Sequence, residues 1–494
     1  MTLAHIAVFI AAALLYVWLL PVRWRRWALL ATSVFAVYWL QPALPIRYLD
    51  FALPTATLIL SVVVWWVTQA ARPQPPAPSP SGSRGERQPL APVNSEDRAT
   101  LGLVALLVVG LSLTRYLAPE LRPTPSRAPD ALAVIAALVI LALAGAALWR
   151  LASGWKGLIS AVIGLIVGLF VILKTEPLAV GASATLRGAA AQNPELAAVV
   201  DLRWLGFSYI AFRLLHVLRD RQTGKLPALS LREHMTYAIF FPALTAGPID
   251  RAERFVRDER ALAATLTAPC FVEAAGRITA GLVKKFVVSD SLALFALNAT
   301  NAEQATSAPA LWLLLYAYAF RLFLDFSGYT DIAIGIGLLV GIRLPENFNQ
   351  PYVKPNLAAF WQSWHMTLSN WVRFYVFSPL SRALLARKAN PLAAVFAAQM
   401  ATMIVIGLWH AVSWNFLIWG LWHGLGLFAH KVWSDRTRKR YLALKQHPRR
   451  ERAWHIAGVL LTFHFVTLGW VWFALADVGQ AWDVLLRLLG LNTW

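Results

Sequence analysis

Charged side chains are scarce in this chain of 494 residues. Aspartate, glutamate, lysine and arginine make up 14% of it, whereas hydrophobic residues make up 58%. Soluble domains carry about 25% charged residues, so the shortage excludes an ordinary water-soluble fold. The composition indicates a protein whose solvent is largely lipid.

Cysteine is almost missing as well. Cys270 is the single cysteine, which excludes an intramolecular disulfide, a CxxC redox pair and a cysteine-rich zinc site. The sequence also lacks an HExxH motif and a carboxylate-rich ligand pattern. We therefore expect no bound metal and no resident cofactor.

Alternating polar and apolar stretches, which would form strands, are absent. Long apolar runs such as 3–20 and 158–174 take their place, and a helix of about 20 apolar residues crosses a hydrocarbon core of about 30 Å. We predict an all-α, polytopic transmembrane helical bundle with about eleven crossings. The first run lacks a basic leader and a cleavage site, so we interpret it as a spanning helix and not as a signal peptide.

The formal net charge is +20, yet nucleic acid is not the expected partner. Lysine and arginine cluster between apolar runs, as in 219–225 and 431–452, and basic residues in short loops mark the cytoplasmic side of a membrane protein. The pattern predicts a multi-pass protein of the plasma or inner membrane whose N-terminus lies outside. The lipid bilayer is then its first partner.

Composition divides the chain into six segments. The linker among them is rich in proline, serine and arginine and has almost no large apolar residue, so it cannot build a core. In order, we expect N-terminal transmembrane helices in 1–70, a disordered cytoplasmic linker in 71–99, transmembrane helices in 100–200, a core that holds the candidate catalytic residues in 201–430, a basic cytoplasmic loop in 431–452, and C-terminal transmembrane and amphipathic helices in 453–494.

Two aspartates, Asp325 and Asp331, interrupt the apolar helix expected in 309–341. Ionisable groups inside a membrane are costly, which makes Asp331 a candidate functional residue. A structural alternative stays open, because Ser327 and Asp331 are four residues apart and can satisfy each other on one helix face. Small residues such as Gly328 suit close helix packing there.

The segment PENFNQPY (345–352) follows, with two prolines around Asn347 and Asn349. Asparagine and proline favour turns, and irregular backbone at membrane depth is tolerated only inside protein or beside a cavity. We expect an elbow that lines a site.

A histidine, His365, lies in WQSWHMTLSNW (361–371), near the start of an amphipathic helix and ahead of Arg373. A functional imidazole fits this pattern. A histidine hydrogen-bonded at the headgroup interface fits it equally.

The segment GLWHAVSWNFLIWGLWHG (407–424) holds His410, beside Trp409, and His423 in nearly apolar surroundings. The two histidines lie on different faces of a straight helix, so they cannot chelate one ion together. A desolvated imidazole stays neutral and can accept a proton, as a general base must. A plain core histidine remains the alternative.

Four motifs occur in order along the chain and carry a family resemblance. They are FFPALTAGPIDR (240–251), GLVKKFVVSD (281–290), DFSGYTDIAIGIGLLVGIRLPENFNQPY (325–352) with FWQSWHMTLSNWVR (360–373), and GLWHAVSWNFLIWGLWHG (407–424). Together they resemble the membrane-bound O-acyltransferase family, and the nearest branch resembles bacterial alginate O-acetyltransferases and D-alanyl-teichoic acid transferases.

The resemblance implies transfer of an acetyl or similar small acyl group from a cytoplasmic thioester to a hydroxyl of an exported polysaccharide or envelope polymer. His410 matches the family's membrane-buried histidine, which would be the general base, and His365 matches a second histidine. His365, Asn347 or Asn349 would supply donors for the oxyanion. Acyl-CoA or an acyl-carrier thioester would be the co-substrate.

Partners follow from the same resemblance. A cytoplasmic acyl carrier and an extracytoplasmic acyl-transfer protein are expected, and the basic residues Lys284, Lys285 and 431–452 could attract an anionic donor. Alternatively, these basic residues could act only to orient the protein in the membrane. The chain departs from the family pattern at Ala411, where glycine is usual, and at Phe374, where aspartate is usual; both departures bear on substrate and rate.

Other function classes stay open at this point. A proton-coupled transporter or flippase would use His410, His365 and Asp331 as a proton relay, and it predicts matching halves with broken helices, which the sequence does not show. A catalytically silent binding scaffold is another alternative. For an acyltransferase, a lipid or a protein acceptor is also open.

Overall fold

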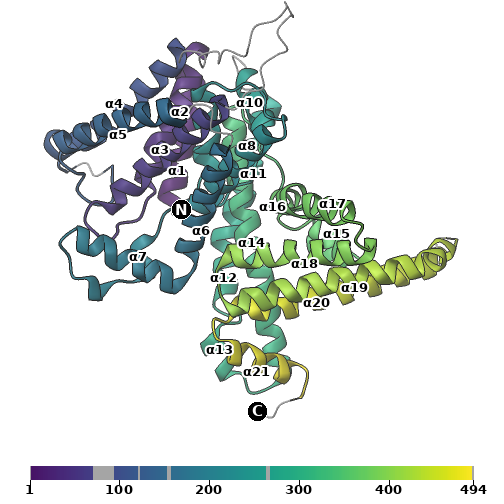
Figure 1. The fold of residues 1–494 in the computed structure, drawn as a ribbon. Coiled ribbons are helices and arrows are strands. Elements are labelled where there is room, and N and C mark those ends of the chain that lie inside the picture. Colours follow the sequence, from purple (N-terminus) through teal and green to yellow (C-terminus); the bar gives the residue numbers. More distant parts are fainter. Residues whose placement is uncertain are drawn as a thin grey trace, which may run out of the picture. The chain divides into compact units, whose positions relative to one another are not determined.

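The computed structural model describes residues 2–70, 94–120, 123–152, 157–262, 267–444 and 446–491. These residues form helices joined by short connections, and no strand occurs among them. Two compact units divide the chain: the first consists of 1–271 with 336–343, and the second of 272–335 with 344–494. Figure 1 shows the helices, coloured from purple to yellow in their order along the chain. The fold class is therefore the predicted all-α class.

The first unit begins with long apolar helices and continues with shorter ones. Its helices are α1 (Leu3–Leu19), α2 (Val22–Trp39), α3 (Leu49–Ala70), α4 (Ser95–Leu117), α5 (Ala131–Ala152), α6 (Leu158–Lys174), α7 (Glu176–Ala189), α8 (Phe207–Gln222), α9 (Leu231–Ala238), α10 (Ala252–Arg260) and residues 268–271 of α11 (Ala268–Leu282). It also has 3₁₀ turns at Pro194–Leu196, Val199–Leu202 and Phe241–Ala243.

The second unit contains every predicted site residue. Its elements are residues 272–282 of α11, a π-helix (Val283–Ser289), α12 (Asp290–Ala293), α13 (Ala299–Gln304), α14 (Ala308–Leu339, except its last turn), a 3₁₀ turn (Pro351–Val353), α15 (Leu357–Trp361), α16 (Met366–Val372), a second π-helix (Arg373–Phe377), α17 (Ser378–Ala386), α18 (Pro391–His410), α19 (Trp414–Leu444), α20 (Pro448–Ala474) and α21 (Val478–Leu488).

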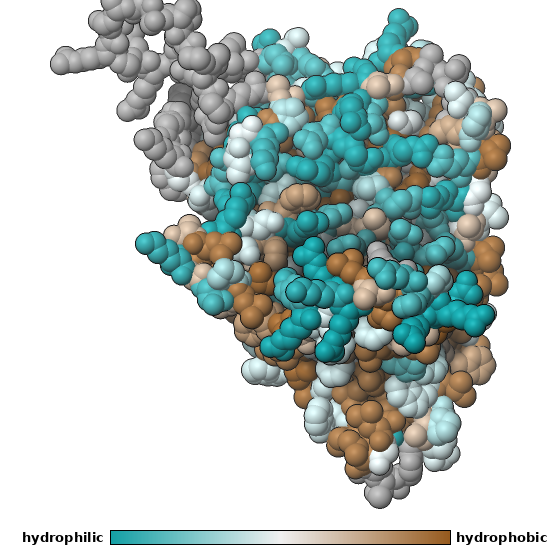
Figure 2. Space-filling model, turned by 90° about the vertical axis from the view of Figure 1, so that its right-hand side faces the viewer, coloured by the Kyte–Doolittle hydropathy of each residue, from teal (hydrophilic) through white to brown (hydrophobic). Residues whose placement is uncertain are grey.

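Five of the described helices, namely α3, α4, α14, α18 and α20, are long and apolar enough to cross a bilayer. A sixth crossing results if α6 and α7, bent by 96° at Thr175, are counted as one span. The estimate of about eleven crossings is not confirmed, because the apolar α1 and the described part of α5 are shorter than a full span. Large apolar side chains such as Leu106, Ile140 and Leu461 stand at the surface, and brown hydrophobic patches are visible in Figure 2, as expected of a multi-pass membrane protein.

Two expected connections are helical where the structure describes them. The linker predicted in 71–99 lies outside the described residues as far as residue 93, but α4 begins at Ser95, where the Asn94 side chain accepts a hydrogen bond from the Asp97 N–H. The basic loop predicted in 431–452 is wrong, since α19 runs to Leu444 and α20 starts at Pro448. Lysine and arginine are good helix formers, so a basic segment can prolong both helices.

Helix α9 ends at Ala238 and is not continued through 239–247. Pro242 and Pro248 cannot donate backbone hydrogen bonds, and the chain turns irregularly instead. The buried Arg213 guanidinium donates to the carbonyls of Ala238 (3.1 Å) and Ala243 (2.8 Å). An arginine thus replaces the helical hydrogen bonds that the prolines prevent.

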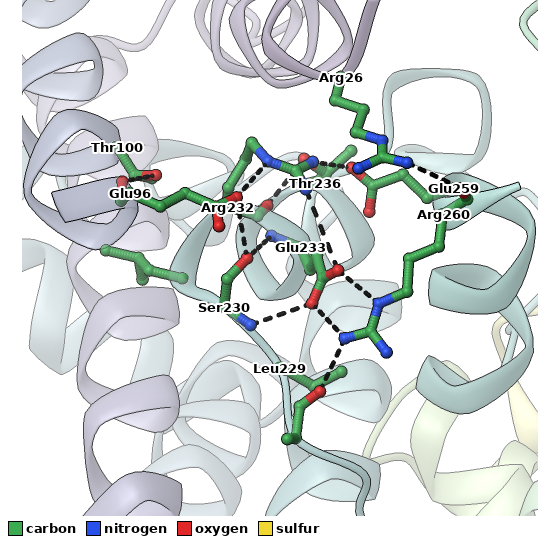
Figure 3. A network of polar contacts seen from close by, with 12 residues as sticks. Arg26, Glu96, Thr100, Leu229, Ser230, Arg232, Glu233, Thr236, Glu259 and Arg260 are labelled. Carbon is green, nitrogen blue, oxygen red and sulfur yellow. Dashed lines mark hydrogen bonds and ion pairs between the residues drawn. The ribbon is translucent and has the colours of Figure 1, made fainter. Parts of the chain in front are cut away.

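A polar network holds together α4, α9 and α10 in the first unit. Arg232 donates to Glu96 (2.8 Å) and to the fully buried Glu259, and Arg260 forms two hydrogen bonds to Glu233 (2.7 and 2.8 Å). Figure 3 shows these side chains converging. Because buried charges are stable only when paired, the network fixes how these helices pack.

Close helix packing in the second unit depends on glycine, as predicted for α14. A Cβ at Gly328 would lie 2.8 Å from the Gly281 carbonyl oxygen of α11, and one at Gly335 would lie 2.9 Å from the Ala274 carbonyl oxygen. The backbones of α11 and α14 therefore approach more closely than any larger residue allows.

Candidate active site

His410 is the last residue of α18, and not a residue in the middle of a long helix. The nearly apolar segment 407–424 is not one helix, because it is interrupted at 411–413 before α19 begins at Trp414. The two helices touch at glycines: a Cβ at Gly407 would lie 2.2 Å from the Phe416 carbonyl oxygen. The hairpin therefore presents His410 at a helix end, where its ring is not covered by a following turn of the same helix.

Aromatic rings surround the half-buried His410 imidazole. Its ring centroid lies 4.6 Å from that of Trp409, 5.5 Å from Phe416, 5.9 Å from Trp419 and 4.8 Å from Phe473 of α20. Such rings are large and apolar, so they pack against the imidazole and fix its orientation.

The departure at Ala411 is compatible with this geometry. Ala411 has φ −160° and ψ 151°, which is extended backbone open to any residue. A glycine is therefore not needed at this position for the turn between α18 and α19.

His365 precedes the first residue of α16 and is almost fully buried. Its backbone is left-handed, with φ +42° and ψ +53°, a conformation that is uncommon for residues other than glycine and that occurs often at functional sites. Its ring meets Phe326 edge-on at 4.7 Å and Trp409 at 6.0 Å.

Trp409 thus touches both predicted histidines. The structure brings together His365, Trp409 and His410, which the sequence placed in two segments more than 40 residues apart. The indole contacts both imidazoles, and this trio is the centre of the candidate site.

Asn347 belongs to the same cluster, whereas Asn349 does not. The buried Asn347 Oδ1 accepts hydrogen bonds from His365 Nδ1 (3.3 Å), the Thr367 N–H (3.3 Å) and the Thr367 hydroxyl (2.6 Å). Its Nδ2 donates to Thr330 Oγ1 (3.4 Å). The Asn349 side chain is exposed and makes no hydrogen bond with the described residues, although its N–H donates to the Ser363 carbonyl (3.0 Å).

The predicted elbow at 345–352 lines a cavity of about 420 Å³. Asn349, Phe348 and Tyr352 form one wall and Thr330 and other residues of α14 form another. Phe348 contacts Phe326 at 5.1 Å, and Phe326 in turn contacts His365. The rings of Phe348 and Phe326 therefore connect the lining of the cavity with the histidine.

Asp331 faces this cavity, and its partners differ from the predicted one. Its carboxylate accepts hydrogen bonds from Arg277 (2.7 Å) and Lys284 (2.6 Å), whereas the Ser327 hydroxyl makes none with the described residues. Arg277 also pairs with Glu346. The expected Ser327–Asp331 pair is wrong, because Arg277 of α11 and Lys284 of the following π-helix are cations that bind a carboxylate more strongly than a hydroxyl does.

The charges of both lysines predicted at the basic rim are balanced by α14. Lys284 pairs with Asp331 and Lys285 pairs with Asp325. A π-helix, a form found often at functional sites, places these consecutive lysines against one neighbouring helix.

Two other predicted residues lie outside the histidine cluster. Arg373 is the exposed first residue of a π-helix. His423 is fully buried among the rings of Trp419 (4.8 Å) and Trp361 (5.2 Å), and neither of its ring nitrogens has a hydrogen-bond partner among the described residues. Trp419 also contacts His410, with 5.9 Å between the ring centroids, but His423 makes no direct ring contact with either His365 or Trp409 among the described residues.

Sequence patterns did not indicate several residues that complete the site. Phe473 reaches His410 from α20, and Arg277 reaches Asp331 from α11; no local signal marks either. Thr367 lies two residues after His365, and its position in a segment already singled out was the one available clue. No group of three or more metal-ligating side chains occurs among the residues that the structure describes.

Comparisons with known proteins agree with these features. The profile of the MBOAT, membrane-bound O-acyltransferase family matches residues 6–469. The probable alginate O-acetylase of Pseudomonas aeruginosa is 32% identical over 59% of this chain and 52% of its own length. The peptidoglycan O-acetyltransferase of Helicobacter pylori is 34% identical over 56% and 52%, and the teichoic acid D-alanyltransferase of Streptococcus thermophilus is 31% identical over 55% and 68%.

The chain spans about half the length of the first two of these relatives. The family profile, by contrast, covers nearly the whole chain, including both histidine segments and the elbow between α14 and α15. This multi-pass helical protein, with its two histidines on one tryptophan, belongs to the membrane-bound O-acyltransferase family.

Proposed function

We propose that the protein is a membrane-embedded O-acyltransferase that moves an acetyl or similar small acyl group from a thioester to a hydroxyl of an exported polysaccharide or envelope polymer. The observation that carries this proposal is the convergence of His365 and His410 on Trp409. The relatives' names support the acceptor class, since they specify alginate, peptidoglycan and teichoic acid.

In the proposed reaction the acceptor oxygen attacks the thioester carbonyl while His410 removes the hydroxyl proton. The C–S bond then breaks, and the proton passes from His410 to the departing thiolate, so that an ester and a thiol result. General-base catalysis of this kind is worth about 10²- to 10⁴-fold in rate. The aromatic rings around His410 support the role because they hold the imidazole in one position.

The cavity beside the elbow is the proposed approach for a substrate arm. Its volume of about 420 Å³ lies within the range of small-molecule sites, and its lining residue Phe348 contacts Phe326, which contacts His365. The donor would be acyl-CoA or an acyl-carrier thioester. The plasma or inner membrane, a cytoplasmic acyl carrier and an extracytoplasmic transfer protein complete the proposal.

Replacement of His410 by glutamine tests the function. We expect His410→Gln and His410→Ala to lower the alkali-labile acyl content of envelope polymers by about 10²-fold or more, measured by mass spectrometry of cells or membranes. His455→Gln is the matched control, because His455 is exposed and lies on α20 away from the rings around His410. We also expect His423→Gln to retain part of the activity, although it disturbs the core.

Mass spectrometry of the carboxylic acid that alkali releases from the polymer identifies the acyl group. Wild-type acylation in a folded His410→Ala variant would contradict the proposed base. A transporter or scaffold function would then have to be considered, with transport assays on the same variants.

A further inference from the structure

The backbone N–H of Thr367 shows which atom of the Asn347 amide is the oxygen and which is the nitrogen. A backbone N–H always donates, and the Thr367 N–H points at Asn347 Oδ1. The Thr367 hydroxyl lies 2.6 Å from the same atom, and Nδ2 on the other side faces Thr330 Oγ1. The atom near His365 is therefore the amide oxygen, which can only accept.

This orientation determines the tautomer of His365. Its Nδ1 lies 3.3 Å from Asn347 Oδ1, and because the oxygen is an acceptor, Nδ1 must carry the hydrogen. In a neutral imidazole the lone pair then belongs to Nε2. No carboxylate is among the described contacts of this ring, so nothing there favours a doubly protonated imidazolium.

His365 Nε2 is a buried atom with no hydrogen-bond partner among the described residues. The left-handed backbone at His365 and the ring of Phe326 hold the imidazole in place, so it cannot turn freely to find one. Buried polar atoms are normally hydrogen-bonded, and an acceptor held rigidly beside Trp409 is suited to a ligand that brings a donor.

We propose that Asn347 is a positioning residue that locks His365 in the Nδ1–H tautomer, and that His365 Nε2 accepts a hydrogen bond from an N–H or O–H group of a substrate. The inference rests on the proposed function and assigns the second histidine a role different from oxyanion binding. A neutral Nε2 repels an oxyanion, and the Asn347 amide is already used by Thr330, Thr367 and His365. The donor group is either an amide of the thioester's arm or a hydroxyl of the acceptor.

The tautomer can be measured without any activity assay. Full-length protein labelled with ¹⁵N,¹³C-histidine is studied in liposomes by solid-state NMR, where the protonated and lone-pair nitrogens have well-separated shifts. Subtraction of the His365→Gln spectrum isolates the signal. We expect Nδ1–H in wild type, and a tautomer mixture or Nε2–H in Asn347→Leu.

Thr367→Val is the matched control. It removes a hydrogen bond to the same Asn347 oxygen but leaves the acceptor for His365, so we expect the wild-type tautomer. Nε2–H in the wild-type protein, or Nδ1–H unchanged in Asn347→Leu, would overturn the proposal whatever the enzyme's substrate turns out to be.

Kinetics then identify the donor group. We expect Asn347→Leu to raise one KM by about tenfold, as the loss of one hydrogen bond predicts. A higher KM for the thioester assigns the contact to the donor arm, and a higher KM for the polymer assigns it to the acceptor hydroxyl. Unchanged KM values in Asn347→Leu would refute the substrate contact. Loss of acylation in His410 variants tests the function separately.

Discussion

At the scale of single residues, the site is built from polar atoms whose partners are limited by burial. Asp331 illustrates this: its carboxylate is almost fully buried and is shared by Arg277 and Lys284. Asp325, one and a half turns earlier on α14, is half-exposed and pairs with Lys285 alone. The same helix therefore offers two ion pairs that differ mainly in burial.

We expect Asp331→Asn to destabilise the protein by roughly 1–3 kcal/mol, because two cations lose their shared charge in a partly buried setting. Asp325→Asn should cost less than about 1 kcal/mol, since an exposed pair contributes little. Thermal unfolding in detergent compares the two variants. Equal losses would show that burial does not distinguish the pairs.

At the scale of elements, the α18–α19 hairpin places His410. The hairpin depends on two glycines, since a Cβ at Gly407 would lie 2.2 Å from the Phe416 carbonyl oxygen and one at Gly420 would lie 2.7 Å from the Met403 carbonyl oxygen. Backbone atoms cannot move aside without shifting a whole helix. The position of His410 against Trp419 and Phe473 is therefore a property of the helix pair.

Gly420→Ala should force α18 and α19 apart. We expect a loss of about 1–3 kcal/mol in stability, as overpacking usually costs, together with reduced acylation because the rings around His410 separate. Gly276→Ala is the control, since a Cβ there meets no atom within 4 Å and alanine favours the helix. Thermal unfolding and ester content report both effects, and a Gly420→Ala variant as active and stable as Gly276→Ala would contradict the close approach.

At the scale of the whole molecule, the two units have different tasks. All the predicted site residues lie in the second unit. The first unit holds the network of Figure 3, in which Glu259 and Glu233 respond to pH in opposite directions. Burial raises the pKa of Glu259 to about 6. Burial would also raise the pKa of Glu233, but hydrogen bonds from Arg260 and Ser230 outweigh it and lower that pKa.

The raised pKa of Glu259 predicts a pH dependence of stability. Between about pH 4.5 and 6 the folded state binds this proton more tightly than the unfolded state, so its contribution is present at low pH and is lost as the pH rises. The loss is at most about 2 kcal/mol. The pKa of Glu233 is lowered, so the contribution of Glu233 to stability is instead lost as the pH falls. We expect Glu259→Gln to remove the fall in melting temperature between pH 4.5 and 6.5, and an unchanged profile would show that Glu259 is ionised throughout.

The sequence by itself determined the class of this protein. Scarce charge and long apolar runs specified membrane helices, because the cost of burying polar groups in lipid acts on composition directly. Local motifs identified His365, His410, Trp409 and Asn347 as candidates, and Gly328 as a packing residue. Proline and asparagine at 345–352 indicated an irregular elbow, since these residues act through local backbone geometry.

Only the tertiary structure decided which of these candidates meet. His365 and His410 share Trp409, whereas Arg373 and Asn349 are exposed and His423 is packed in the core, although all lie in equally suggestive segments. The Asp331 carboxylate pairs with Arg277 and Lys284, and not with Ser327. The tautomer of His365 depends on Asn347, eighteen residues away in the chain. Such contacts join segments whose spacing in sequence has no fixed relation to distance, because helix packing sets them and composition does not.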